Sequence, residues 1–257
     1  MSKQQLNEVK IILTDIDDTL TTDGRLKSNA YTALENLSNS GFIVIPVTGR
    51  CAGWCDHIAR MWPVNGVVGE NGAFFFSYDH QSKKMQQTYC QTPKERKENH
   101  LALHEIKKTI LKNVSGSALA SDQDYRHTDL AIDFAEDVAT LSSNKIKEIV
   151  TIAENAGAIA KVSSIHVNCW IGSHNKLSTS LTTLEQVFGV SNSNIQNEVL
   201  FIGDSPNDSM MFDYFNKSVG VANVMDFIKE LDKPPKYITL NHSGEGFVEL
   251  ADSLLRR

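Results

Sequence analysis

The sequence predicts an α/β fold, a Rossmann-like parallel sheet with helices on both faces, into which a smaller α+β domain is inserted. Short apolar runs alternate with amphipathic helical patterns over residues 9–62 and again from about residue 177. This alternation is typical of parallel sheets with right-handed crossovers. Between the two regions a charged helical stretch and strands of alternating polarity replace this pattern. We therefore expect a core of residues 1–82 and 173–257 and a cap domain of residues 83–172.

The first strand is predicted at residues 9–14, where apolar residues in a row end abruptly in acid. A helix follows, with Ser28 as its expected cap and Gly41 as its stop. A second buried strand at residues 42–47 runs into Thr48-Gly49-Arg50 and another short helix.

The inserted segment combines helices with strands of alternating polarity. A charged helix is predicted after Pro93, and the clearest alternation in the chain lies at residues 165–171. There His166, Asn168 and Trp170 point to one side and apolar residues to the other. We expect the apolar face to pack and the polar face to be open.

After the insert, the alternation of apolar runs and amphipathic helical patterns returns. A helix is predicted at residues 177–188 and a strand at residues 199–202, which again ends in acid. Short apolar runs at residues 218–222 and 237–240 would complete the sheet.

Composition excludes some classes of function. The 257 residues carry a formal net charge of -6, which argues against a non-specific nucleic-acid binder. The start is polar, and no apolar run is long enough to span a membrane, so we expect a cytoplasmic protein with reduced thiols. Cys51, Cys55 and His57 stand close together, but a zinc site normally needs four ligands, so we favour packing roles for them.

Polar residues follow three of the predicted core strands. Asp15 and Asp17 follow the first, Thr48 the second, and Asp204 the strand after the insert. Because the carboxyl ends of parallel strands lie at one edge of a sheet, we expect these side chains to meet. Gathered carboxylates repel each other unless a cation is present, and Mg²⁺ prefers such oxygen ligands. The pattern predicts a Mg²⁺ site with Asp15, Asp204 and Asp208 as ligands.

These residue types suit phosphoryl transfer. The ionised carboxylate of Asp15 can attack phosphorus and form an acyl-phosphate. Asp17 can protonate the leaving alcohol and later deprotonate the attacking water. Thr48, the Gly49 amide and Lys176, which stands at a helix start, are expected to hold the phosphoryl oxygens.

Four motifs resemble, in order, those of haloacid dehalogenase superfamily phosphatases: Asp15-Ile16-Asp17-Asp18-Thr19, Thr48-Gly49-Arg50, Lys176, and Gly203-Asp204-Ser205-Pro206-Asn207-Asp208. The resemblance covers the whole chain. The insert is similar to the type IIB cap of the Cof-like branch, whose members include sucrose phosphatase and mannosyl-3-phosphoglycerate phosphatase. The resemblance implies a nucleophile at Asp15, an acid/base at Asp17, and a Mg²⁺ site to which Asp15, Asp17, Asp204 and Asp208 contribute. Ser205-Pro206 departs from the pattern of many Cof-like members and leaves the substrate open.

Further residues are expected to support the site. Asn207 would orient Lys176 or the metal shell, and Asn71 belongs to an Asn-Gly-Ala stretch similar to that of the Cof-like branch. Arg50 either clamps a substrate phosphate or ribose or pairs with a surface acid. The candidates on the cap are Arg126, His166 and Asn168. Asp18 is expected to have a turn or surface role.

The leading hypothesis is a magnesium-dependent phosphatase that acts on a small phosphomonoester, with a sugar phosphate as the expected substrate. A phosphomutase-type phosphotransferase would use the same Asp15 and Asp17. A non-catalytic phosphosugar-binding protein would keep the fold but would have no need for an acid/base. The expected partner is a small phosphorylated metabolite, with no nucleic acid and no membrane; the oligomeric state is left open.

Overall fold

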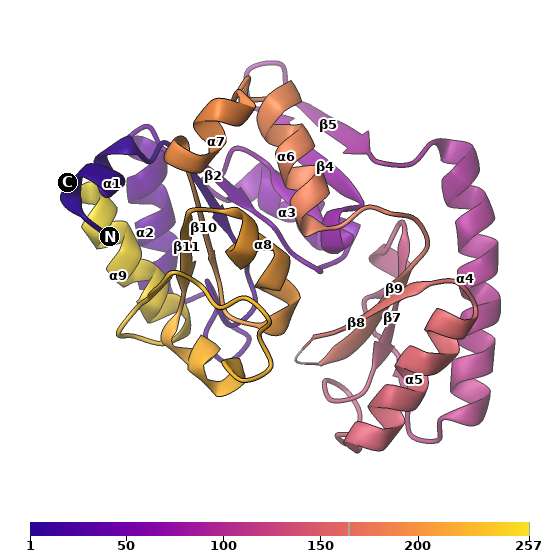
Figure 1. Ribbon diagram of the computed structural model, residues 1–257. Helices are drawn as coiled ribbons and strands as arrows, with labels where there is room; N and C mark the ends of the chain where they lie inside the picture. The colour runs from indigo at the N-terminus through magenta and orange to yellow at the C-terminus, as the bar shows by residue number, and fades with distance from the viewer. Residues whose placement is uncertain (164, 257) are drawn as a thin grey trace.

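The computed structural model describes residues 1–163 and 165–256, which form two lobes (Figure 1). The larger lobe contains a five-stranded parallel sheet in the order β12-β11-β10-β1-β2. Its strands are β1 (Ile11–Thr14), β2 (Ile43–Pro46), β10 (Val199–Gly203), β11 (Lys217–Gly220) and β12 (Tyr237–Ile238). An antiparallel sheet in the same lobe consists of β3 (Val67–Gly69), β4 (Phe74–Asp79) and β5 (Lys84–Tyr89). The predicted α/β class is confirmed.

Helices cover both faces of the parallel sheet because its strands alternate apolar side chains between the two sides. Ile12 of β1 packs with α2 (Ser28–Asn39), α3 (Ala52–Met61) and α9 (Ser243–Leu255). Ile11 and Leu13 pack with α6 (Lys176–Gln186), α7 (Asn192–Glu198) and α8 (Ser209–Tyr214). Shorter elements are α1 (Lys3–Glu8) and the 3-10 turns η1 (Glu70–Gly72), η3 (Pro206–Asp208) and η4 (Ala222–Phe227).

The start of α2 differs in detail from the prediction. Ser28 is the first helical residue, and Lys27 occupies the cap position without a side-chain hydrogen bond.

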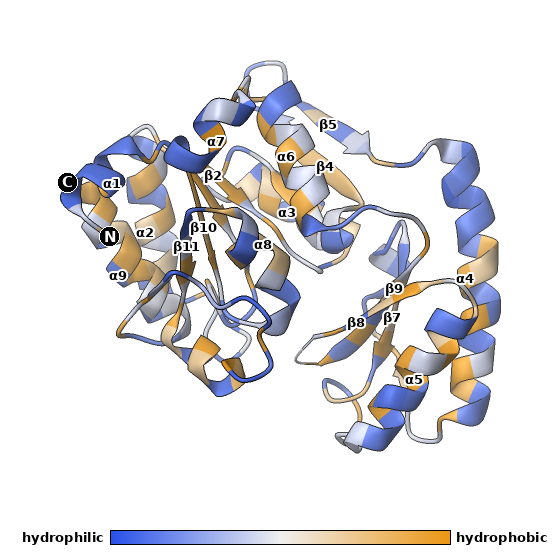
Figure 2. Cartoon of the chain, in the orientation of Figure 1, coloured by the Kyte–Doolittle hydropathy of each residue, from blue (hydrophilic) through white to orange (hydrophobic). Residues whose placement is uncertain are grey.

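The smaller lobe contains an antiparallel sheet in the order β6-β7-β9-β8, covered on one face by two helices. Its elements are α4 (Pro93–Asn113), β6 (Ala118–Leu119), η2 (Gln123–Tyr125), β7 (Asp129–Asp133), α5 (Ser143–Asn155), β8 (Ile159–Val162) and β9 (His166–Trp170). Val167 and Cys169 of β9 face α4 and α5, whose exposed surfaces are largely hydrophilic (Figure 2).

The sequence predicted an open polar face on β9, and this prediction is wrong. His166, Asn168 and Trp170 are only 3%, 4% and 2% exposed. Arg126 of this lobe hydrogen-bonds Gly49 of the larger lobe, and Trp170 Nε1 donates to the carbonyl of His174. The alternation of polar and apolar residues along a strand identifies which face is polar. It does not show whether that face lies in solvent or is covered by another lobe.

The predicted start of the cap at residue 83 stays a prediction, although β5 pairs with β4 rather than with the cap sheet. Within the described residues, no helix combines the length and hydrophobicity needed to cross a bilayer.

Candidate active site

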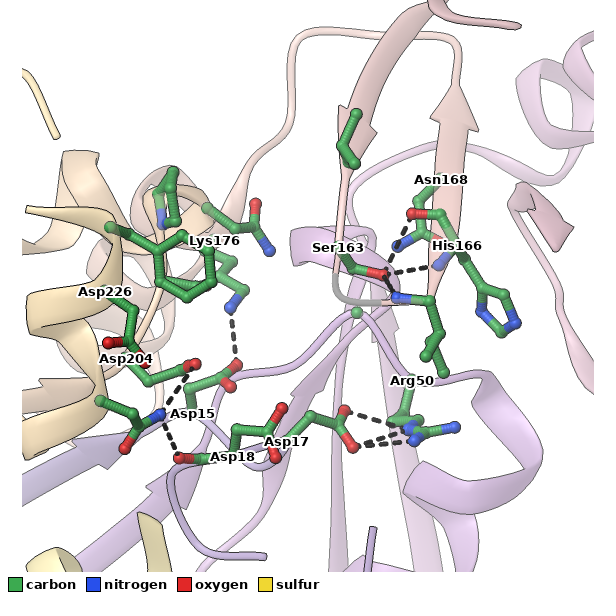
Figure 3. A pocket seen from close by; sticks show the side chains of 18 of the residues that line it. Asp15, Asp17, Asp18, Arg50, Ser163, His166, Asn168, Lys176, Asp204 and Asp226 are labelled. Carbon is green, nitrogen blue, oxygen red and sulfur yellow. Dashed lines mark hydrogen bonds and ion pairs between the residues drawn. The ribbon is translucent and has the colours of Figure 1, made fainter. Parts of the chain in front are cut away.

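Three acids and a lysine meet at the carboxyl edge of the parallel sheet. Asp15 follows β1, Asp204 follows β10, and Lys176 is the first residue of α6. Lys176 Nζ lies 2.7 Å from Asp15 Oδ1 and 2.8 Å from Asp208 Oδ1 (Figure 3). All four side chains are buried. The meeting of these residues at one sheet edge is therefore observed.

The electrostatics of this cluster favour a bound cation. Burial, together with the charges of Asp208 and Asp17, raises the pKa of Asp15 to about 7 despite the opposing charge of Lys176. Burial and the charges of Asp15 and Asp208 raise the pKa of Asp204 well above its ordinary value. Burial acts to lower the pKa of Lys176, but its two carboxylate partners raise it, so this lysine is charged.

A divalent cation fits this donor set. Asp15, Asp204 and Asp208 each offer a carboxylate oxygen, and these atoms lie within 4.8 Å of one another. Hard ions such as Mg²⁺ prefer such oxygen donors, and a cation would offset the repulsion that raises the two pKa values. Asp208 also holds its neighbours, because its second oxygen accepts from the Asp204 amide at 3.1 Å.

Asp17 is engaged by Arg50. Both oxygens of the Asp17 carboxylate accept hydrogen bonds from the guanidinium, at 2.8 to 3.1 Å. The Arg50 side chain also lies over the ring of Trp54 and approaches Glu136 of the cap to 3.7 Å. Of the two roles that the sequence left open for Arg50, pairing with a surface acid is not observed, because the acid that it pairs with, Asp17, lines the cavity.

The loop after β2 is held from several sides. Thr48 is fully buried, and its hydroxyl accepts a hydrogen bond from the Arg50 amide at 3.0 Å. Gly49 lines the cavity, and its carbonyl accepts from Arg126 of the cap at 3.2 Å. Asn71 has a left-handed backbone conformation with φ 55°, and its backbone N–H donates a hydrogen bond to the Thr48 carbonyl.

Asn207 does not orient Lys176 in the observed contacts. Its amide donates to Asn71 Oδ1 at 3.4 Å, whereas Asp208 holds the lysine. The carboxylate of Asp208 is charged, so it can hold an ammonium group more firmly than the neutral amide of Asn207 could.

The three cap candidates all line the cavity. The Arg126 guanidinium is buried and bonded to Asp122 and Asp129. Burial and the charge of Arg126 lower the pKa of His166. Its Nε2 lies 2.9 Å from a carboxylate oxygen of Glu136, but the geometry is not that of a hydrogen bond. Asn168 lies beside Gly49.

The cavity has a volume of about 470 Å³ and is lined by both lobes. Its floor carries Asp15, Asp17 and Lys176, and its cap side carries Ser163 and His166 (Figure 3). This volume is within the range of small-molecule sites.

Sequence reasoning missed three participants. Glu70, fully buried, accepts from the Ala52 amide and from the amides of residues 127–129, and so ties the cap to the start of α3. Asn223 donates to the Asp18 carbonyl. Asp18 lies in a turn, as expected, and it also lines the cavity. Glu136 had no local signal in the sequence, whereas the position of Glu70 directly before Asn71-Gly72 could have drawn attention to it.

The cysteines do not form a metal site with His57. Cys51 and Cys55 are buried thiols, whereas His57 is exposed. Burial raises the pKa of Cys51 to about 11, which disfavours the thiolate that zinc requires.

Comparison with known proteins connects this arrangement to a family. Residues 12–249 match the model of the haloacid dehalogenase-like hydrolases. The chain is 24% identical over 252 residues to a phosphoglycolate phosphatase of Methanobrevibacter smithii, with 96% of this chain and 99% of the relative covered. Among solved structures, a Thermoplasma acidophilum protein matches with a TM-score of 0.72 and 18% identity, covering 96% of this chain and 98% of the other.

A sugar phosphatase of haloacid dehalogenase subclass IIB has the same fold, with a TM-score of 0.61 and 14% identity over 90% of this chain and 93% of the other. The expected type IIB architecture is thereby confirmed. The chain belongs to the haloacid dehalogenase-like hydrolases, and its enzymatic class is that of a phosphatase.

Proposed function

We propose that this protein is a magnesium-dependent phosphatase that hydrolyses a small phosphomonoester, a sugar phosphate, through an aspartyl-phosphate on Asp15. The observation that carries the proposal is the contact of Lys176 with both Asp15 and Asp208 on the floor of the cavity. A buried, charged lysine beside a carboxylate provides an anchor for a phosphoryl group next to a nucleophile.

In the first half-reaction, Asp15 forms a bond to phosphorus while the ester bond breaks, and Asp17 gives its proton to the leaving oxygen. In the second, water attacks the phosphoryl group, Asp17 takes the water's proton, and the bond to Asp15 breaks. Lys176, Thr48 and the Gly49 amide hold the phosphoryl oxygens throughout. Mg²⁺ bound at Asp15, Asp204 and Asp208, beside Asp17, would offset the negative charge that gathers there.

The pairing of Asp17 with Arg50 sets a condition on this sequence of events. Both carboxylate oxygens accept hydrogen bonds from the guanidinium. Asp17 can exchange a proton with the leaving group only when one oxygen has turned away from Arg50. We infer that substrate binding loosens this pair.

The name of the Methanobrevibacter relative makes phosphoglycolate a second candidate substrate. It differs from a sugar phosphate in carrying a carboxylate on the leaving group instead of hydroxyls. A phosphomutase activity would yield an isomer of the substrate without free phosphate.

The test is a phosphate-release screen over sugar phosphates, phosphoglycolate and an aryl phosphate, with Mg²⁺ and with a chelator. We expect release that depends on Mg²⁺ and falls by about a thousandfold or more in Asp15→Asn. Asp213→Asn, a change to an exposed acid of α8, is the matched control. Full activity of Asp15→Asn would refute the nucleophile, and an isomeric product without phosphate would refute hydrolysis.

A further inference from the structure

The side chain of Asn168 occupies the place where the cap meets the phosphate-binding loop. Asn168 lies on β9, on the face opposite Val167 and Cys169, and lines the cavity. A Cβ atom placed on Gly49 would lie 3.3 Å from Asn168 Nδ2. Figure 3 shows the residue on the cap side of the cavity, across from Asp15 and Lys176. A molecule bound at Gly49 would therefore touch this amide.

None of the residues that the structure describes donates a hydrogen bond to the side-chain oxygen of Asn168. The residue is 4% exposed, and its Oδ1 has no hydrogen-bond partner among the described residues. Buried polar atoms are nearly always paired, and an unpaired one costs about 1–3 kcal/mol. With the amide oxygen and nitrogen placed as they are in the structure, this buried acceptor needs a hydrogen-bond donor. The missing donor is one that a ligand can supply.

The charges around the cavity decide what kind of ligand fits. Among the described lining residues, each Lys and Arg is already paired: Arg50 with Asp17, Arg126 with Asp122 and Asp129, and Lys176 with Asp15 and Asp208. His166 beside Asn168 has a lowered pKa, caused by burial and the charge of Arg126, and is neutral near pH 7. These described lining residues therefore offer no unpaired cation beside Asn168 to receive a carboxylate on the leaving group.

A hydroxyl group matches Asn168 better than a carboxylate does. A hydroxyl both donates and accepts, so it can donate to Oδ1 and accept from Nδ2. A carboxylate only accepts, and it would leave Oδ1 unpaired while adding negative charge to an acidic cavity.

We propose that Asn168 contacts the substrate and recognises a hydroxyl group on the leaving group, close to the ester, so that the substrate class is the phosphate monoester of a polyol or sugar. This inference rests on the proposed phosphatase function and assigns the specificity of that same site to one cap residue. A substrate without the hydroxyl binds with the Asn168 acceptor still unpaired and is turned over more slowly.

The experiment compares two substrates of equal carbon length, glycerol 3-phosphate and propyl phosphate, with phosphoglycolate as the carboxylated third. In the wild type, kcat/KM is expected to be highest for glycerol 3-phosphate. Asn168→Ala should lower kcat/KM for glycerol 3-phosphate by roughly 10- to 100-fold and change it less than about twofold for propyl phosphate. Asn155→Ala, at an exposed position of α5 in the same lobe, should change neither.

Three results separate this inference from the proposed function. Equal losses for both substrates in Asn168→Ala would overturn the inference, because a merely structural role lowers both alike. Wild-type preference for propyl phosphate or phosphoglycolate would overturn it as well. Absence of release from every phosphoester, including the aryl phosphate, would instead refute the phosphatase function. If Asn168→Ala does not fold, Asn168→Leu keeps the side-chain size. It should show the same larger loss of kcat/KM for glycerol 3-phosphate than for propyl phosphate.

Discussion

Acid should destabilise this protein through one buried histidine. His174 lies between β9 and α6, two residues before Lys176, and is 6% exposed. Its ring stacks on Trp170 with centroids 6.0 Å apart, and its Nε2 is buried without a partner among the described residues. Burial lowers the pKa of His174 from its ordinary value of 6.5 to about 4.

The sign of the effect follows from which state binds the proton. Between pH 6.5 and about 4 the unfolded chain protonates His174 while the folded chain keeps it neutral. The contribution of His174 to stability is thus complete above pH 6.5 and is lost as the pH falls toward 4. At about 1.4 kcal/mol per pH unit, the loss over this window is on the order of 3 kcal/mol.

The measurement is the free energy of unfolding by urea at several pH values between 7 and 4, for wild type and His174→Gln. Carboxylates also titrate in this range, so the difference between the two proteins isolates His174. We expect the wild type to lose on the order of 3 kcal/mol more than His174→Gln on acidification. His100→Gln, at an exposed position of α4, should follow the wild type. Parallel curves for wild type and His174→Gln would refute the reasoning.

Two further changes test how the site is held. Gly72→Ala should destabilise the fold by about 2 kcal/mol or more, because Gly72 has φ +103° and an added Cβ would lie 2.2 Å from the carbonyl oxygen of Asn175. Asn175 directly precedes Lys176, so the same change should lower activity. Gly189→Ala, with φ +66° but open space, should cost only about 1 kcal/mol, and equal melting temperatures for the two variants would contradict this account. Arg126→Gln should lower the free energy of unfolding by about 3–5 kcal/mol, because it leaves the charges of Asp122 and Asp129 uncompensated. Adding Asp129→Asn should restore part of the loss in a thermal unfolding experiment. An unchanged melting curve of Arg126→Gln would contradict this prediction.

The sequence alone determined the elements and the chemistry that local pattern encodes. Apolar runs at residues 9–14 and 199–202 predict buried strands, and both strands are found and pair directly as β1 and β10. Because parallel strands end at one edge, the sequence also predicts that Asp15 and Asp204 meet there. The assignment of Asp15 to catalysis stays a prediction that Asp15→Asn tests.

Only the tertiary structure decided how the cap completes the cavity. The alternating strand at residues 165–171 looks half exposed, yet its polar side is buried against the larger lobe. The sequence names Arg126 only as a cap candidate, and the structure shows that two acids and the Gly49 carbonyl accept its hydrogen bonds. Likewise, the contact of Arg50 with Asp17 joins residues 33 positions apart. Period and propensity report which face of an element is apolar; what covers the other face depends on contacts between segments distant in the chain.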